Sequence, residues 1–179
     1  MKNLREDALK IISDSISSVL PEKAVEEELK RLNLNCDIYV IAIGKASWRM
    51  AKSARDFLNG RIKGGVVITK YGHSLGPIDG IEVYEAGHPI PDENTINATK
   101  RAVRLVQNLS KDDVVLFLVS GGGSSLFELP VDGVSLEDIK NVTDMLLRCG
   151  ANIVEINTIR KRLSQVKGGR FALMASPAK

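Results

Sequence analysis

Residues 114–125 read VVLFLVSGGGSS, an apolar run that passes directly into three glycines flanked by serines. An uninterrupted apolar run of this length is typical of a buried strand. Glycine adopts positive φ and has no side chain, so three in succession allow backbone N–H groups to converge on an anion. The alternative is a tight strand-to-helix turn without a ligand. We favour the anion-binding interpretation, in which the bound anion contacts Ser120, Gly121, Gly122, Gly123, Ser124 and Ser125.

Strand-like and helical segments alternate along the chain. Asp92, Ser135 and Asn152 are the expected N-caps of three of the helices. The predicted strands are 37–43, 64–69, 81–85 and 114–119, and the predicted helices are 4–20, 21–32, 46–58, 93–109, 135–148 and 152–166. This alternation indicates an α/β, Rossmann-like fold, with a doubly wound, mostly parallel sheet in a three-layer α/β/α arrangement.

Length and composition exclude several classes of protein. The length of 179 residues is typical of one domain, so residues 1–179 are treated as one α/β unit. A net charge of +3 and an aromatic content of 4% provide neither the basic surface nor the stacking platforms of a nucleic-acid binder. No apolar run approaches the roughly 18 residues of a membrane span, and residues 1–10 lack the apolar core of a signal peptide. We therefore expect no nucleic-acid partner, no membrane partner and a cytoplasmic location.

Lys45 follows the predicted strand 37–43 and stands at the start of a helix. Ligands of open α/β sheets bind outside the carboxyl ends of the strands, where Lys45 and the glycine turn are both expected. An ammonium group there adds its charge to that of the helix N-terminus and neutralises a carboxylate or phosphate. The alternative is an ordinary exposed lysine whose stem lies along the surface.

Three more residues are candidates for contact with an anion. His88, held in a Gly-His-Pro turn, is suited to donate to an oxyanion or to act as an acid or base near neutral pH. For His73 we prefer a solvated loop histidine. Lys167 and Arg170 flank a glycine pair that permits close contact with an anion, the alternative being a solvated basic face. No Asp, Glu or His cluster has metal-ligand spacing, so the metal ligands are unknown.

Two common nucleotide-binding motifs are incomplete in this sequence. Gly44-Lys45 resembles the end of a Walker loop, but Tyr39 replaces the required earlier glycine and Ala46 replaces the required hydroxyl residue. The glycine turn reaches Leu126 where a dinucleotide fingerprint needs its third glycine. Both departures weigh against a P-loop and against a nicotinamide site.

Six segments of the chain together resemble the N-terminal domain of the glycerate 2-kinase family, whose members are often labelled hydroxypyruvate reductases. They occur in the family order and span nearly the whole chain. The matching segments are 43–47, 65–73, 87–94, 118–126, 157–164 and 167–170.

That resemblance implies phosphoryl transfer from ATP to D-glycerate, with 2-phosphoglycerate as the expected product and Mg²⁺ as the metal. It makes Lys45 the leading catalytic residue and assigns the glycerate carboxylate or a phosphate to the glycine turn. It also implies two α/β domains with the active site in the cleft between them. This chain is accordingly expected to be the N-terminal domain without its C-terminal partner, and a homodimer is the expected assembly.

Two other functions stay open on the sequence. One is a non-catalytic module that binds a sugar phosphate or an organic acid through the same glycine turn. The other is an NAD(P)-dependent hydroxypyruvate reductase, against which the missing dinucleotide fingerprint weighs.

Overall fold

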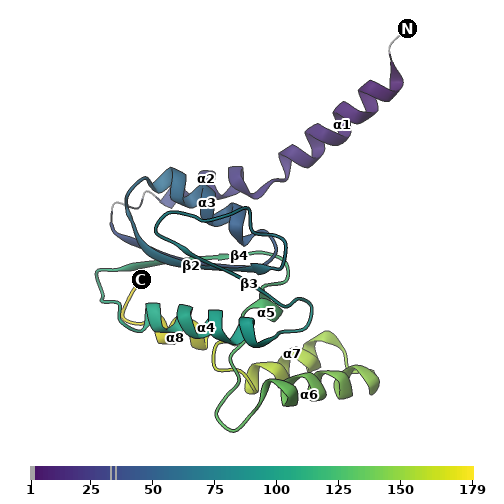
Figure 1. Cartoon of the computed structure of the whole chain (residues 1–179), viewed down its shortest axis with the longest axis vertical. Helices are drawn as coiled ribbons and strands as arrows, with labels where there is room; N and C mark the ends of the chain where they lie inside the picture. Colours follow the sequence, from purple (N-terminus) through teal and green to yellow (C-terminus); the bar gives the residue numbers. More distant parts are fainter. Residues whose placement is uncertain (1–2, 33, 35) are drawn as a thin grey trace.

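The computed structural model describes residues 3–32, 34 and 36–179 (Figure 1). Met1 and Lys2, part of the segment searched for a signal peptide, lie outside this range. At the centre is a parallel sheet in the order β3-β2-β1-β4. The strands are β1 (Ile38–Ile43), β2 (Ile62–Lys70), β3 (Glu82–Ala86) and β4 (Val114–Val119). Because β1 lies between β2 and β4, the chain winds outward on one side of β1 and then crosses to the other side.

Helices cover both faces of this sheet (Figure 1). On one face, α2 (Pro21–Leu32) packs on α3 (Ser47–Leu58), and α3 contacts β1 and β2. On the other face lie α4 (Glu93–Val106) and α8 (Arg170–Ala175). The Rossmann-like, doubly wound, three-layer fold predicted from the sequence is confirmed.

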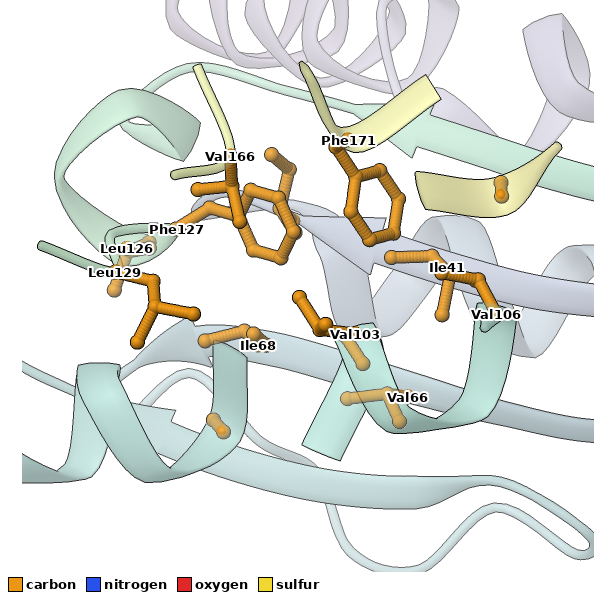
Figure 2. Packing of buried hydrophobic residues seen from close by; sticks show 14 of the residues in the cluster. Ile41, Val66, Ile68, Val103, Val106, Leu126, Phe127, Leu129, Val166 and Phe171 are labelled. Carbon is orange, nitrogen blue, oxygen red and sulfur yellow. The ribbon is translucent and has the colours of Figure 1, made fainter. Parts of the chain in front are cut away.

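Alternation along the strands divides the core into two clusters. Ile41 and Ile43 of β1 belong to the cluster under α4 and α8, whereas Val40 and Ala42 belong to the cluster under α2 and α3. Successive side chains of a strand point to opposite faces, so one apolar strand contributes to both layers. Figure 2 shows the first cluster, in which side chains of the sheet, α4 and α8 meet, including those of Ile41, Ile68, Val103, Val106 and Phe171.

The strand at 114–119 forms as predicted, but the prediction that it is buried is wrong for part of its length. Phe117 is 42% exposed and Val119 is 54% exposed. The reason is that α4 packs on β2 and β3, whereas Phe117 and Val119 of the edge strand β4 face an open cavity. Within the described residues the edge of β4 away from β1 pairs through the backbone of Lys179, which donates to the Asp113 carbonyl and accepts from the Val115 N–H.

Several helices differ from their predicted bounds. The first helix, α1 (Leu4–Ser18), ends earlier than predicted, extends away from the sheet and has no buried residue (Figure 1). The predicted helix 93–109 ends at Val106. The helices α6 (Leu136–Arg148) and α7 (Ile153–Arg162) pack on each other. Helix 152–166 was predicted too long, because Ser164 leaves the helical path to form an antiparallel bridge with Pro130.

Two short helices, α5 (Gly123–Leu126) and α8, were not predicted. Each is too short to show a helical period in the sequence. No helix in the described part of the chain is both long enough and apolar enough to span a bilayer.

All three predicted N-caps are confirmed as capping boxes. The Asp92 carboxylate accepts from the Thr95 N–H at 2.9 Å, and the Thr95 hydroxyl accepts from the Asp92 N–H at 3.1 Å. Ser135 and Asn152 cap α6 and α7 in the same manner. The Asp92 carboxylate also accepts from the Tyr71 hydroxyl at 2.7 Å, which ties the loop after β2 to α4.

Replacing Asp92 by Ala is expected to lower the free energy of unfolding by about 1 kcal/mol or more near neutral pH, because a cap is lost. Burial raises the pKa of Asp92, but hydrogen bonds from Tyr71 and from the Thr95 and Gly87 backbones outweigh it and lower the pKa. A carboxyl with a lowered folded-state pKa stabilises the fold above its unfolded value of roughly 3.9 and loses this contribution as pH falls through the folded value. Urea unfolding near neutral pH and at about pH 3 measures the difference between the proteins, which should shrink on acidification.

The matched control is Asp112→Ala, since Asp112 is exposed in a loop. A difference between wild type and Asp92→Ala that stays constant across this pH range would contradict the assignment of Asp92 as a charged cap.

Candidate functional site

Two turns meet at the carboxyl ends of β1 and β4. The Ser120 N–H donates to the Ile43 carbonyl at 2.9 Å, and the Lys45 N–H donates to the Gly121 carbonyl at 2.9 Å. The Ala46 N–H donates to the Ser120 hydroxyl at 3.1 Å. In the order β3-β2-β1-β4, the chain reverses direction between β1 and β4, so these bonds hold the turns together at the topological switch point. This is where doubly wound sheets bind ligands.

Gly44 makes this close approach of the two turns possible. Its φ is +115°, and a Cβ atom at this position would lie 2.3 Å from the Ser120 Oγ and 2.5 Å from the Ser120 carbonyl oxygen. Both the backbone conformation and the lack of space therefore require glycine. Gly44 also donates its N–H to the Ile68 carbonyl and so connects the turn to β2.

The glycine turn, residues 120–125, exposes backbone donors. Among the described residues, the N–H groups of Gly121, Gly122 and Ser124 find no hydrogen-bond acceptor, whereas the Gly123 N–H donates to the Ser120 carbonyl. Gly122 has a φ of +90°. Unpartnered N–H groups on a turn of this kind form the concave donor array that binds anions.

Lys45 and His88 both lie against the glycine turn. A Cβ atom on Gly122 would stand 2.7 Å from the His88 Nε2 and 3.5 Å from the Lys45 Cγ. Lys45 is exposed, and it forms no ion pair with any described residue. A cation without a carboxylate partner beside unpartnered N–H donors has the electrostatics of an anion-binding site.

The loop after β2 supports the same turns. His73 is exposed, and its Nδ1 lies 3.1 Å from the Lys45 carbonyl oxygen. The Asn94 amide donates to the Tyr71 hydroxyl at 2.8 Å, and the hydrogen bond from this hydroxyl to Asp92 raises the pKa of Tyr71. The sequence predicted His73 as a loop residue and Asp92 as a cap, but not these contacts, because they join segments far apart in the chain.

Lys167 is beside the glycine turn but already has partners. Its ammonium donates to the Ser124 carbonyl at 2.6 Å and to the Phe127 carbonyl at 2.7 Å, and it lies 3.1 Å from the Glu128 carboxylate. Arg170 donates to the carbonyls of Lys161 and Ser164, rather than to the turn. Of the two predicted basic residues, the structure therefore brings Lys167 alone against the glycine turn, and the predicted contact of either one with an anion stays a prediction.

Glu128 and Arg160 are part of the site's surroundings, and Glu128 was missed by sequence reasoning. The Glu128 side chain is 0% exposed, with Arg160 at 3.6 Å from the same oxygen that Lys167 approaches. The only sequence signal is one acidic residue inside the apolar run Leu126-Phe127-Glu128-Leu129. Burial lowers the pKa of Lys167, against the opposing effect of the Glu128 charge.

A cavity of about 600 Å³ opens beside the glycine turn along the exposed side of β4. Its lining includes the polar residues Ser124, Arg160 and Lys167 and three aromatic residues, Phe117, Phe127 and Phe171. Figure 2 labels Phe127 and Phe171, whose ring centroids lie 4.9 Å apart in an edge-to-face arrangement.

The described residues do not by themselves fit a magnesium site. They contain no group of three or more His, Cys, Asp or Glu side chains close enough to hold a metal ion. The Asp92 carboxylate lies beside Gly87, but it already caps α4 and accepts a hydrogen bond from Tyr71.

Fold and site together define a Rossmann-like α/β domain with a glycine-rich turn at its topological switch point. The chain belongs to the family described as "Domain of unknown function (DUF4147)", whose model matches residues 7–179. It is 58% identical over 178 residues to the D-glycerate 2-kinase of Thermotoga maritima, and 43% identical over 183 residues to the glycerate 2-kinase of Pyrococcus horikoshii. The crystal structure of glycerate kinase from T. maritima superimposes on the whole chain with a TM-score of 0.94. The resemblance to the glycerate 2-kinase family that the sequence motifs indicated is thus confirmed.

The chain spans less than half the length of these relatives. The alignments cover 99% of this chain but 42% of the T. maritima kinase, and 96% of this chain but 41% of the P. horikoshii kinase. The superposition likewise covers 43% of the T. maritima crystal structure.

Gly44→Ala is expected to lower the free energy of unfolding by roughly 1–3 kcal/mol more than Gly76→Ala and to displace the glycine turn, because the new methyl group would overlap Ser120. Gly76→Ala is the matched control, since Gly76 has a φ of +117° and a Cβ there meets nothing within 4 Å. Urea unfolding compares the two variants, and amide chemical shifts of residues 120–125 report the displacement. Equal destabilisation by the two substitutions would show that the contact between the turns does not require glycine.

Proposed function

We propose that this chain is the N-terminal domain of a D-glycerate 2-kinase, which transfers the γ-phosphoryl group of ATP to the 2-hydroxyl of D-glycerate and releases ADP, 2-phosphoglycerate and a proton. The observation that carries the proposal concerns Lys45: its side-chain stem lies beside Gly121 and Gly122, two residues with unpartnered N–H groups, and it forms no ion pair with any described residue. The names of the relatives, which are glycerate 2-kinases, support D-glycerate as the acceptor, and ATP as the donor is what the family resemblance implies.

Both proposed substrates are anions, so binding them together requires positive charge and N–H donors. Phosphoryl transfer is catalysed chiefly by positioning and by stabilising the charge that develops on the transferring group. We assign this charge stabilisation to Lys45. The glycine turn holds the glycerate carboxylate or a phosphate through its N–H groups and the Ser124 hydroxyl, and His88 donates to the same anion. The predicted contacts of the Ser120 and Ser125 hydroxyls are not part of this proposal, because these hydroxyls donate to the carbonyls of Ile43 and Gly122.

The described residues contain no group of acids or histidines that could hold the predicted Mg²⁺, so we assign no catalytic step to the metal. Magnesium bound with a nucleotide takes its ligands from phosphates, water and one or two carboxylates. We propose that the carboxylates come from the second domain that the family resemblance implies.

The cleft between two domains is also part of the proposal. It is supported by the share of the relatives that the chain covers, and by apolar side chains of β4 that stand partly exposed beside the cavity, those of Phe117 and Val119. The expected homodimer and the cytoplasmic location stay predictions.

A non-catalytic binding module is the second candidate, because the anion site described above needs no chemistry to hold an organic acid or a sugar phosphate. The two functions differ in one measurable respect, since a module of this kind releases no ADP. The third function left open by the sequence is a hydroxypyruvate reductase. It is tested by measuring oxidation of NAD(P)H in the presence of hydroxypyruvate, with the protein that is assayed for ADP release.

Lys45→Met is expected to lower kcat/KM for D-glycerate by about 10²–10³-fold, the cost of losing one charge-stabilising group. The measurement is coupled ADP release with D-glycerate, ATP and Mg²⁺, using a protein that contains this chain and the second domain. The matched control is Lys111→Met, since Lys111 is an exposed lysine in the loop before β4.

Two outcomes would count against the proposal in different ways. Normal turnover by Lys45→Met would remove Lys45 from its catalytic role and leave the kinase activity in place. No ADP release by the wild type would overturn the kinase itself, and binding of D-glycerate without turnover would then favour the binding module.

A further inference from the structure

Glu128 is a buried acid that the proposed phosphoryl transfer does not use. It is the second residue after α5, and its side chain is fully buried. Its N–H donates to the Thr99 hydroxyl of α4 at 3.2 Å, and one carboxylate oxygen accepts from the Leu129 N–H at 3.1 Å. Removing a carboxylate from water is strongly unfavourable unless cations compensate its charge, so the groups around the second carboxylate oxygen are central to the role of Glu128.

Two cations lie close to that second oxygen, Oε2: one is Arg160 of α7, and the other is Lys167, which precedes α8. The Lys167 ammonium lies at 3.1 Å and the Arg160 guanidinium at 3.6 Å. Both side chains are largely buried, with exposures of 12% for Lys167 and 17% for Arg160. One carboxylate therefore compensates two cations in a partly dehydrated cluster, and one positive charge remains when all three groups are ionised.

The same two cations also hold the glycine turn. The Ser124 carbonyl accepts from the Lys167 ammonium at 2.6 Å and from the Arg160 guanidinium at 3.4 Å. Lys167 additionally donates to the Phe127 carbonyl, directly after α5. These hydrogen bonds connect the middle and the end of α5 to Lys167 and Arg160, whose positive charges face the Glu128 carboxylate.

A helix of one turn cannot hold its own orientation by internal hydrogen bonds, because nucleation is costly and α5 has four residues. The direction of the unpartnered N–H groups of Gly121, Gly122 and Ser124 therefore depends on outside contacts. Two sets of hydrogen bonds hold the glycine turn. The first joins it to the turn between β1 and α3, and the second comes from Lys167 and Arg160 to the Ser124 carbonyl.

We propose that Glu128 is a positioning residue for the glycine turn: by compensating Lys167 and Arg160 it keeps both cations on the Ser124 carbonyl, which aims the free N–H groups of the turn at the bound anion. The identity of this anion, the glycerate carboxylate or a phosphate, rests on the proposed function, whereas the effect on the turn does not. Lys167 accordingly acts through the backbone of the turn.

The test uses the protein that contains this chain and the second domain, with three substitutions in this chain: Glu128→Gln, Lys167→Met and the two combined. Glu128→Gln keeps the shape but leaves two cations uncompensated, so it should lower stability and accelerate amide hydrogen exchange across residues 121–126. The combined variant removes a charge of each sign with little change in volume. It leaves the cluster with the one positive charge that it has in the wild type, so it should recover stability. The matched control is Glu27→Gln, since Glu27 is exposed on α2.

Affinity separates positioning from a purely structural role. D-glycerate and inorganic phosphate are the probes, titrated while the amide shifts of residues 120–125 are followed. The affinity of Glu128→Gln is expected to fall about 10-fold or more, the loss typical of one charge-assisted hydrogen bond. In the combined variant stability returns and the affinity does not, because Met donates nothing to the Ser124 carbonyl.

Two results would overturn the proposal. The first is recovery of affinity together with stability in the combined variant, which would make Glu128 a structural residue only. The second is unchanged exchange of amides 121–126 in Glu128→Gln relative to the rest of the chain. If the wild type binds neither probe, the proposed function fails instead, and the hydrogen-exchange comparison still decides whether Glu128 positions the turn.

Discussion

The contact between the turn after β1 and the turn after β4 is the constraint on which the rest of the site depends. Hydrogen bonds from Ser120, Lys45 and Ala46 cross between the turns, and the space at Gly44 admits no side chain. This contact is set by the sheet, since β1 and β4 pair in parallel register over their whole length. Because the strands end together, a lysine and a glycine turn far apart in the sequence meet within a few ångströms.

The basic residues near this contact divide into two kinds, according to their surroundings. Lys45 is exposed and forms no ion pair within the described residues, so its charge is available to a ligand. Lys167 and Arg160 are largely buried, and Glu128 compensates them. A buried cation paired with a carboxylate and bonded to carbonyls supports structure, whereas an exposed cation without an acid partner attracts anions.

The parts of the fold that local patterns control were predictable from the sequence. Apolar runs located the four strands, capping residues located the starts of α4, α6 and α7, and the alternation of elements indicated the doubly wound sheet. The end of α7 was not predictable, because it is set by the bridge between Ser164 and Pro130. These residues are far apart in the sequence, so no local pattern indicates the bridge. The partial exposure of β4 was missed for a similar reason: an apolar run does not reveal which strands a helix covers.

For the site, the sequence by itself determined the chemistry that is present: a glycine turn flanked by serines, a lysine after the first strand and a histidine in a proline-containing turn. The tertiary structure decided which of these meet. It placed Lys45 and His88 against Gly122, gave Lys167 to the backbone of the turn and Glu128, and directed Arg170 to the carbonyls of Lys161 and Ser164. The physical reason is that residue type sets the charge and hydrogen-bonding capacity of a side chain. Long-range packing then decides which partners the side chain meets, and so whether that capacity is used within the fold or remains available to a ligand.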